Sequence, residues 1–280
     1  MTAMNDQQSG LFGAIALLTG AKNTLKGIGF FVGGLLFVVF GMRIALGGLA
    51  GIVAIGLGLT LTLTSTSGSA KAKQFAGIFA HSAAVNRLSV ARFFLFGARD
   101  IWLAIALPLF MASAPGWGFW QSGAVMALYT IGYGVVQAST PRILAGQRAP
   151  DGRLTALLAG APLAVCLGSA GLAQQFGANV WGILVAVCLF SLLFALNSAV
   201  HSYLIAAYAA RDAISLNIGF YYSANSLGRL VGTLLSGWCY LQWGIVGSMA
   251  VAGLMFIPAA ICAWPLPAPS GQIAVSGGDE

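Results

Sequence analysis

The sequence predicts an all-α integral membrane protein, and three observations support that prediction. Of the 280 residues, 59% are hydrophobic and only 7% are charged, whereas an ordinary soluble domain is about 25% charged. Apolar runs of the roughly 20 residues that a bilayer crossing needs recur along the chain. Most of the segments between these runs are short. A surface of this composition needs lipid as its solvent, so we expect little protein outside the membrane.

Eight apolar runs are the predicted membrane helices, and their order defines the expected architecture. They cover residues 11–41, 43–64, 88–113, 119–139, 154–174, 179–207, 213–238 and 242–264. The first run is too long for one upright crossing, so we expect it to tilt or to extend beyond the apolar layer. Pro108, Pro162 and Pro258 lie inside runs and are expected to kink their helices.

The longest polar interruption divides the chain into two unequal parts. Residues 1–64 hold two runs, and residues 65–87 form a predicted cytoplasmic loop. Residues 88–264 hold six runs and are expected to form a six-helix lobe, followed by a disordered cytoplasmic tail over 265–280.

Basic residues are concentrated in every second connection between the apolar runs. Every second connection carries Lys or Arg, namely Lys71, Lys73, Arg87, Arg142, Arg148, Arg153 and Arg211. The other connections have none except Arg43. Because Lys and Arg concentrate in cytoplasmic loops, we expect both termini to face the cytoplasm. The same bias accounts for most of the net charge of +7, which in a soluble protein would suggest nucleic acid or another acidic partner.

Small residues recur at helical spacing in two places. Glycines fall every seven residues at Gly13, Gly20, Gly27, Gly34, Gly41 and Gly48. A second stripe has small residues every four positions at Ala224, Gly228, Gly232 and Ser236. Such stripes allow membrane helices to approach closely, so we interpret both as packing surfaces.

Five charged residues stand at possible membrane depth. They are Lys22, Lys26, Arg99, Asp100 and Arg229. A charge at the bilayer centre costs at least about 2.5–3.5 kcal/mol, so each must face a partner or a wet cavity. Arg92 lies near the end of its run and is expected to extend its charge to the interface.

The neighbouring charges Arg99 and Asp100 point about 100° apart on a helix. We therefore expect no pair between them, and a basic partner for Asp100 on another helix. Arg99 is then expected to face the cavity. The alternative is a purely structural ion pair that fixes the register of the helices.

Further polar residues extend this hypothesis. Tyr222, Asn225 and Arg229 follow the spacing i, i+3, i+7 and form one polar face that favours a pathway-lining helix. Lys22 and Lys26, with Asn23 beside them, either line the cavity or mark the cytoplasmic edge of a span that begins near Gly27.

Asn197 and His201 form a weaker polar pair, one turn apart at the end of their run. His201 is either a proton carrier or a hydrogen-bonded histidine at the interface. Asp100 is the other candidate proton carrier.

The chemistry of these residues favours transport of an anion. Four suspected intramembrane cations stand against Asp100, and arginine offers a planar fork that matches carboxylate or phosphate. The cysteines are scattered singly and are interpreted as small buried hydrophobic residues, at Cys166, Cys188, Cys239 and Cys262. We predict no metal and no cofactor. An enzyme is disfavoured because the six acidic residues do not cluster inside a run and the two histidines are distant.

Four segments resemble one family of transporters. The pieces "ALLTGAKNTLKGIGFFVGGLL", "ARFFLFGARDIWLAIALPLF", "IGYGVVQASTPR" and "GFYYSANSLGRLVGTLLSGW" resemble the organoarsenical efflux permeases of the major facilitator superfamily. The resemblance covers about residues 6–265. It implies export of 1-arseno-3-phosphoglycerate across the bacterial inner membrane. A glyceraldehyde-3-phosphate dehydrogenase makes that solute, and the two proteins together confer arsenate resistance.

The resemblance also implies a fold, a bundle in which twelve helices form two lobes. The eight runs would match helices five to twelve, so the first four would be absent and the chain would be an incomplete transporter. Two other interpretations stay open. One is a major facilitator transporter of another small solute, such as a sugar or a drug. The other is a membrane fragment that does not transport.

Overall fold

The computed structural model describes residues 6–63, 82–144, 150–209 and 214–269, and every regular element in these ranges is a helix. The elements are α1 (Asp6–Leu63), α2 (Ala83–Leu103), α3 (Ala106–Ser113), α4 (Phe119–Ile143), α5 (Gly152–Phe176), α6 (Val180–Tyr208) and α7 (Ile214–Ala263). Five helical stretches in this part of the chain are long and apolar enough to cross a membrane. The structure is therefore compatible with a membrane-embedded, multi-pass helical bundle.

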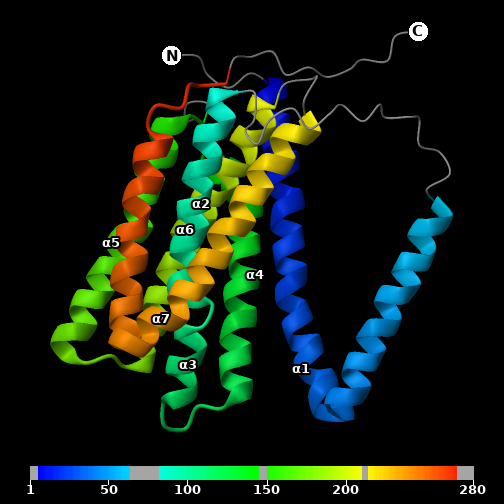
Figure 1. Ribbon diagram of the computed structural model, residues 1–280, viewed down its shortest axis with the longest axis vertical. Coiled ribbons are helices and arrows are strands. Elements are labelled where there is room, and N and C mark those ends of the chain that lie inside the picture. The colour runs from blue at the N-terminus through cyan, green and yellow to red at the C-terminus, as the bar shows by residue number, and fades with distance from the viewer. Residues whose placement is uncertain (1–5, 64–81, 145–149, 210–213, 270–280) are drawn as a thin grey trace.

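Two of the helices are broken at a glycine with positive φ. The break in α1 lies at Gly41 (φ 74°, ψ 167°), and the break in α7 lies at Gly244 (φ 63°, ψ −158°). Side chains disfavour this conformation, which glycine adopts readily. Figure 1 shows that both helices reverse direction at the break. The breaks fall where the sequence separates run one from run two and run seven from run eight.

The third run is interrupted close to its proline. Pro108 has no N–H to donate to the carbonyl four residues earlier, and helix α2 ends at Leu103, just before that position. The backbone N–H groups of Ile105 and Ala106 instead donate to Ser236 Oγ of α7, at 3.2 and 3.1 Å. The predicted kink at Pro108 is confirmed, and Ser236 of the small-residue stripe satisfies the freed donors.

The small-residue stripe of α7 packs directly on α2. A Cβ atom at Gly228 would clash with the backbone of Phe93, and one at Gly232 would clash with the backbone of Gly97. This contact requires glycine at both positions, so the prediction that the stripe is a packing surface is confirmed. The two helices lie side by side in Figure 1, in agreement with this close approach.

The glycine stripe of α1 is a packing surface only in its middle. Gly20 and Gly27 lie against the backbone of α4, and Gly34 lies against Trp120. Gly13, Gly41 and Gly48 face open space, so the prediction is wrong for these three glycines. Beyond Gly41 the second arm of α1, residues 42–63, stands away from the other helices in Figure 1.

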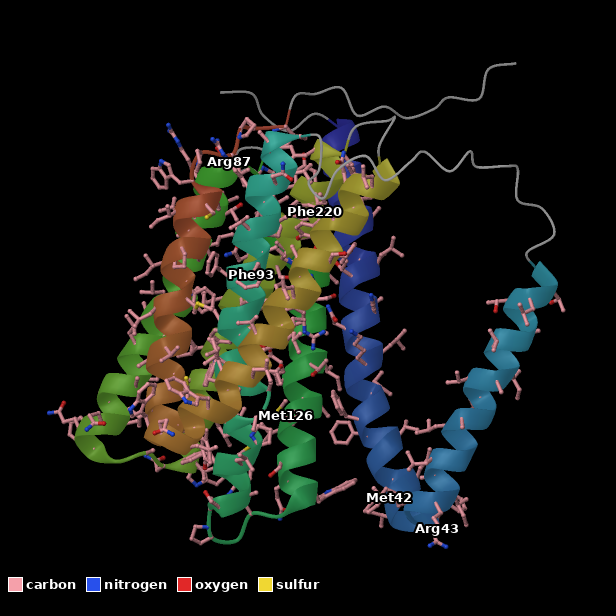
Figure 2. All side chains as sticks on the ribbon, in the orientation of Figure 1. Met42, Arg43, Arg87, Phe93, Met126 and Phe220 are labelled. Carbon is pink, nitrogen blue, oxygen red and sulfur yellow. The ribbon has the colours of Figure 1, made fainter. Side chains whose placement is uncertain are left out.

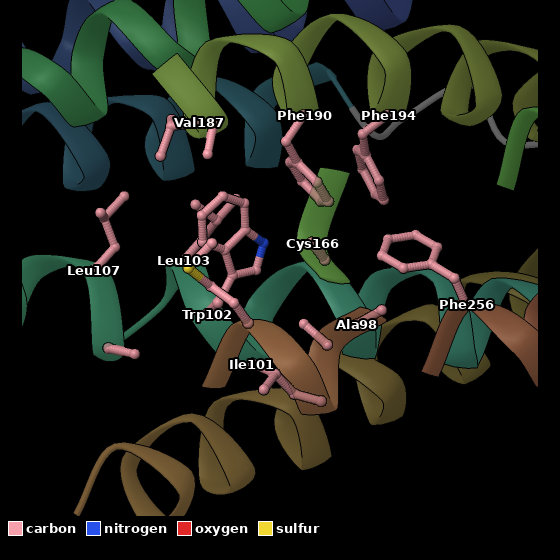
Figure 3. Packing of buried hydrophobic residues seen from close by; sticks show 14 of the residues in the cluster. Ala98, Ile101, Trp102, Leu103, Leu107, Cys166, Val187, Phe190, Phe194 and Phe256 are labelled. Carbon is pink, nitrogen blue, oxygen red and sulfur yellow. The ribbon is translucent and has the colours of Figure 1, made fainter. Parts of the chain in front are cut away.

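An aromatic core holds α2, α6 and the second half of α7 together (Figure 3). The ring centroids of Trp102 and Phe190 lie 5.0 Å apart, and those of Phe190 and Phe194 lie 5.4 Å apart. Phe256 packs against both phenylalanines of α6. This core fixes α2 against α6, and so positions the charged residues that α2 carries.

One predicted boundary differs from the structure. Residues 83–87 belong to α2, so the expected loop over 65–87 ends earlier than predicted. Arg87 and Arg43 lie at opposite ends of the bundle in Figure 2, as their places in the predicted loops require. Four of the predicted loop cations lie outside the described residues, namely Lys71, Lys73, Arg148 and Arg211. Most of the predicted tail, residues 270–280, also lies outside them.

Candidate functional site

A buried carboxylate joins two arginines where α2 and α7 cross. Asp100 Oδ1 accepts from Arg99, whose Nε and Nη2 both lie 2.6 Å away. Asp100 Oδ2 accepts from Arg229 Nε of α7 at 2.9 Å. The prediction that Asp100 has a basic partner on another helix is confirmed. The prediction that Arg99 and Asp100 do not pair is wrong, because the long arginine side chain bends back along its own helix.

The three members of this ion cluster differ in exposure. The Asp100 side chain is 6% exposed and that of Arg99 is 15% exposed, whereas that of Arg229 is 51% exposed. Arg229 therefore pairs through Nε and also presents part of its guanidinium outward. We call these three residues the ion cluster.

The lysines of α1 add to the ion cluster from a third helix. Lys22 and Lys26 are both exposed, and α1 runs through them as a continuous helix. Lys26 is close enough to Arg99 and Arg229 for their charges to interact. Lys26 of α1 is therefore within electrostatic range of the arginines of α2 and α7, and the shared cavity stays a prediction.

Tyr129 of α4 also belongs to this region, although the sequence analysis did not select it. Its hydroxyl is buried and has no hydrogen-bond partner among the described residues. It lies close enough to Arg99, Asp100 and Arg229 to interact with each of their charges. A tyrosine pair at positions 129 and 133 inside an apolar run was the available signal, because both hydroxyls lie on one face of α4.

Arg92 forms a second polar cluster, two turns before Arg99 on α2. It is 5% exposed, so the prediction that it extends to the interface is wrong. Its Nε donates to Asn225 Oδ1 at 3.1 Å, and its Nη1 donates to the carbonyl and hydroxyl oxygens of Ser198 at 3.4 and 3.3 Å. Its guanidinium lies over the ring of Phe96, at 3.8 Å from the centroid.

A chain of hydrogen bonds continues from Ser198 to α1. Ser198 Oγ accepts from Tyr133 Oη at 2.7 Å and from Gln137 Nε2 at 3.5 Å. Gln137 Oε1 then accepts from Asn23 Nδ2 at 2.7 Å. With Arg92 and Asn225, these residues form a polar network that reaches from α1 through α4, α6 and α2 to α7. Asn23 is thus part of an inter-helix contact rather than a free pathway side chain.

The predicted polar face of α7 divides into two. Tyr222 is 46% exposed and lies outward, as part of Arg229 does. Asn225 is partly buried and points to Arg92 of α2. The three residues are therefore not one continuous lining, and only Asn225 joins the polar network.

Asn197 and His201 are buried deep in α6, at 0% and 1% exposure. Neither atom of the Asn197 amide, nor Nδ1 of His201, has a hydrogen-bond partner in the part of the chain that the structure describes. His201 lies close enough to Arg92 for an electrostatic interaction. The burial places the imidazole inside the bundle, and both roles given for His201 stay predictions.

The cysteines are free and do not cluster. Cys166 and Cys239 are buried, Cys262 is partly buried, and Cys188 is exposed, so the prediction of burial is wrong for Cys188. Within the described residues, no group of three His, Cys, Asp or Glu side chains is placed to hold a metal ion.

No protein-family model, curated protein or solved structure matches the chain. The fold and the site therefore define a class of protein only. That class is an all-helical bundle, compatible with a membrane, in which arginines of two helices hold one buried carboxylate. The resemblance to organoarsenical permeases stays a prediction from the sequence.

Proposed function

We propose that the chain belongs to a membrane transporter that exports an organic oxyanion, in the manner of the 1-arseno-3-phosphoglycerate exporters. One observation supports this most directly. Arg99 of α2 and Arg229 of α7 both pair with a single buried carboxylate, Asp100, and Lys26 of α1 lies within electrostatic range of the two arginines. Charges inside membrane helices that face a common space are typical of a solute route.

The balance of charge favours an anion as the solute. Lys22, Lys26, Arg99 and Arg229 carry four positive charges, and Asp100 carries one negative charge, which leaves a net charge of +3. In a site of low dielectric this excess attracts anions strongly. Arginine binds phosphate and carboxylate through two parallel hydrogen bonds, which supplies geometry as well as charge.

The proposed topology has eight crossings with both termini in the cytoplasm of a bacterial cell. The reversals at Gly41 and Gly244 support it, because each gives α1 and α7 two antiparallel arms (Figure 1). The described chain also begins and ends at the same end of the bundle as Arg87 (Figure 2). That end carries the predicted cytoplasmic connections.

The proposal is tested by arsenate resistance in sensitive bacteria that co-express a glyceraldehyde-3-phosphate dehydrogenase. A version of the chain preceded by the four helices that the resemblance implies should protect these cells. Arg229→Ala in that version should abolish protection while the protein stays in the membrane. Arg87→Ala is the matched control, because it removes an exposed arginine from the end of α2. Full protection by the Arg229→Ala variant would show that Arg229 does not contact the solute.

A second candidate is a membrane segment that packs against further helices without transporting by itself. The exposure of Arg229 and Tyr222 favours it, since a charge at this depth needs cover other than lipid. The two candidates differ in proteoliposomes that contain only this chain. Uptake of a phosphate ester supports transport, whereas its absence together with cross-linking of Tyr222→Cys to another membrane protein supports the packing role.

Transport of a neutral sugar or an apolar drug is the remaining alternative. The net positive charge of the site disfavours it, because uncompensated cations stabilise neither class of solute. Competition by a neutral sugar in the same uptake assay would support that alternative.

A further inference from the structure

We propose that Asp100 occupies the anion-binding site of this protein as an internal competitor, and that a solute binds by displacing the Asp100 carboxylate from Arg99 and Arg229. The inference rests on the proposed anion pathway and names the group that the solute replaces. It also assigns Tyr129 as a further ligand of the solute and phosphate-type groups as the preferred chemistry.

The contacts of Asp100 are those expected of a bound oxyanion. One oxygen lies against Nε and Nη2 of Arg99, and the other lies against Nε of Arg229. A carboxylate or phosphate of a solute would use the same donors. Because Asp100 is already on the Nε and Nη2 edge of Arg99, a solute cannot bind that edge unless Asp100 leaves it.

The exposure of the two arginines determines the order in which a solute contacts them. Arg229 is half exposed and Arg99 is almost covered. An incoming anion can therefore meet Arg229 and Lys26 first, and it reaches Arg99 only after the Asp100 carboxylate has moved. The excess positive charge of the site makes this exchange favourable for an anion that carries more charge than one carboxylate.

The ion cluster is not needed to hold α2 and α7 together. The two helices already pack through Gly228 and Gly232 against the backbone of Phe93 and Gly97. A buried ion pair often contributes little net stability, because removing the charges from water offsets their attraction. Its contacts can therefore be exchanged for those of a solute without separating the helices.

Tyr129 points to the kind of anion. Its buried hydroxyl has no partner among the described residues, although it lies near all three members of the ion cluster. A buried polar group without a partner is costly, and native structures normally satisfy it. Both oxygens of Asp100 are taken by arginines, whereas a phosphate-type group offers a third oxygen. We assign the Tyr129 hydroxyl as the donor to that third oxygen, which a carboxylate lacks.

The test is binding of inorganic phosphate and of acetate to the purified full chain in lipid nanodiscs, measured by the ligand dependence of thermal unfolding. Asp100→Asn removes the competing charge, so the phosphate affinity should rise, on the order of tenfold, the change that about 1.4 kcal/mol produces. A purely structural ion pair predicts the opposite, a variant that binds phosphate no better or more weakly. Asp151→Asn is the matched control, because it makes the same substitution at the N-cap of α5 and keeps a good capping residue.

Tyr129→Phe provides a second, independent variant. It should weaken phosphate binding by several-fold and leave acetate binding unchanged. Equal loss for both anions, or no loss for either, would overturn the assignment of Tyr129.

A measurement on the unaltered chain covers the case in which Asp100→Asn does not fold. Carbodiimide labels free carboxylates, and mass spectrometry locates the label. Phosphate should increase labelling at Asp100, since displacement frees its carboxylate. Protection of Asp100 by phosphate would refute the displacement.

The proposed function and this inference fail in different ways. Phosphate-dependent exposure of Asp100 in a chain that gives no arsenate resistance contradicts the transported solute but supports the displacement. Resistance that depends on Arg229, combined with protection of Asp100 by phosphate, supports transport and contradicts the displacement.

Discussion

The guanidinium of Arg92 lies on the ring of Phe96, with Cζ 3.8 Å from the ring centroid. The guanidinium of Arg99 lies 4.6 Å from the same centroid. One aromatic ring of α2 therefore contacts the central arginine of the polar network and a member of the ion cluster. Such contacts stabilise a buried cation through the negative face of the ring.

Phe96→Leu keeps an apolar side chain but removes both cation–ring contacts. We expect it to lower the free energy of unfolding by about 0.5–2 kcal/mol more than Phe256→Leu does. Phe256 is a suitable control because it is fully buried in the same aromatic core. Reversible unfolding in detergent measures both variants. Equal losses would show that the arginine contacts contribute nothing.

Asn225→Leu should destabilise the chain because it leaves Arg92 Nε without its acceptor. The expected loss is about 1–3 kcal/mol, the typical cost of an unsatisfied buried donor. Ser226→Ala is the control on the same helix, since Ser226 is exposed and bonds only to the carbonyl of Tyr222. If the Asn225→Leu variant is as stable as the control, the hydrogen bond from Arg92 to Asn225 does not stabilise the chain.

Gly232→Ala should disrupt the contact between α7 and α2. The added methyl group would clash with the backbone of Gly97, and overpacking of this kind costs about 1–3 kcal/mol. Gly219→Ala is the matched control, because a Cβ atom there meets open space. We expect a lower unfolding temperature for Gly232→Ala alone, measured in the same detergent. If both variants unfold at the same temperature as the unaltered chain, the close contact at Gly232 is not required for stability.

The proposed topology is tested by labelling single cysteines in a chain that lacks its native ones. Cysteines at Arg87 and at Pro115 lie at opposite ends of the span that α2 and α3 form, and both positions are exposed. A reagent that does not cross membranes should label Pro115→Cys in intact cells and Arg87→Cys only after permeabilisation. Labelling of both from outside would overturn the proposed orientation.

The sequence predicted where helices lie along the chain because the signals for them are local. Apolar runs set the helix bounds, Pro108 explains the interruption between α2 and α3, and the four-residue stripe identifies the face of α7 that packs. The seven-residue spacing of glycines in α1 gave a wrong prediction of packing at Gly48. The helix reverses direction at Gly41, and this reversal changes the neighbours of every later residue.

The candidate site was less predictable because its contacts depend on how helices rotate about their axes. The position of Arg92 near the end of an apolar run does not reveal that its side chain points inward to Ser198 and Asn225. The pairing of Arg99 with Asp100 depends on side-chain bending, which backbone periodicity does not describe. The one sequence signal for Tyr129 was its spacing of four residues from Tyr133, and that spacing does not show which side chains of other helices lie nearby.

The second arm of α1 has a consequence for how the chain loses its structure. Among residues 42–62 only Ala45 is buried, so this arm shares almost no surface with the bundle. Regions with few buried contacts open independently of the core, at low local free energy. The arm is therefore a separate cooperative unit, and the helical reversal at Gly41 marks its boundary. In the proposed topology lipid surrounds this arm and keeps its backbone hydrogen bonds intact. The angle between the arm and the bundle should therefore vary while the aromatic core remains intact.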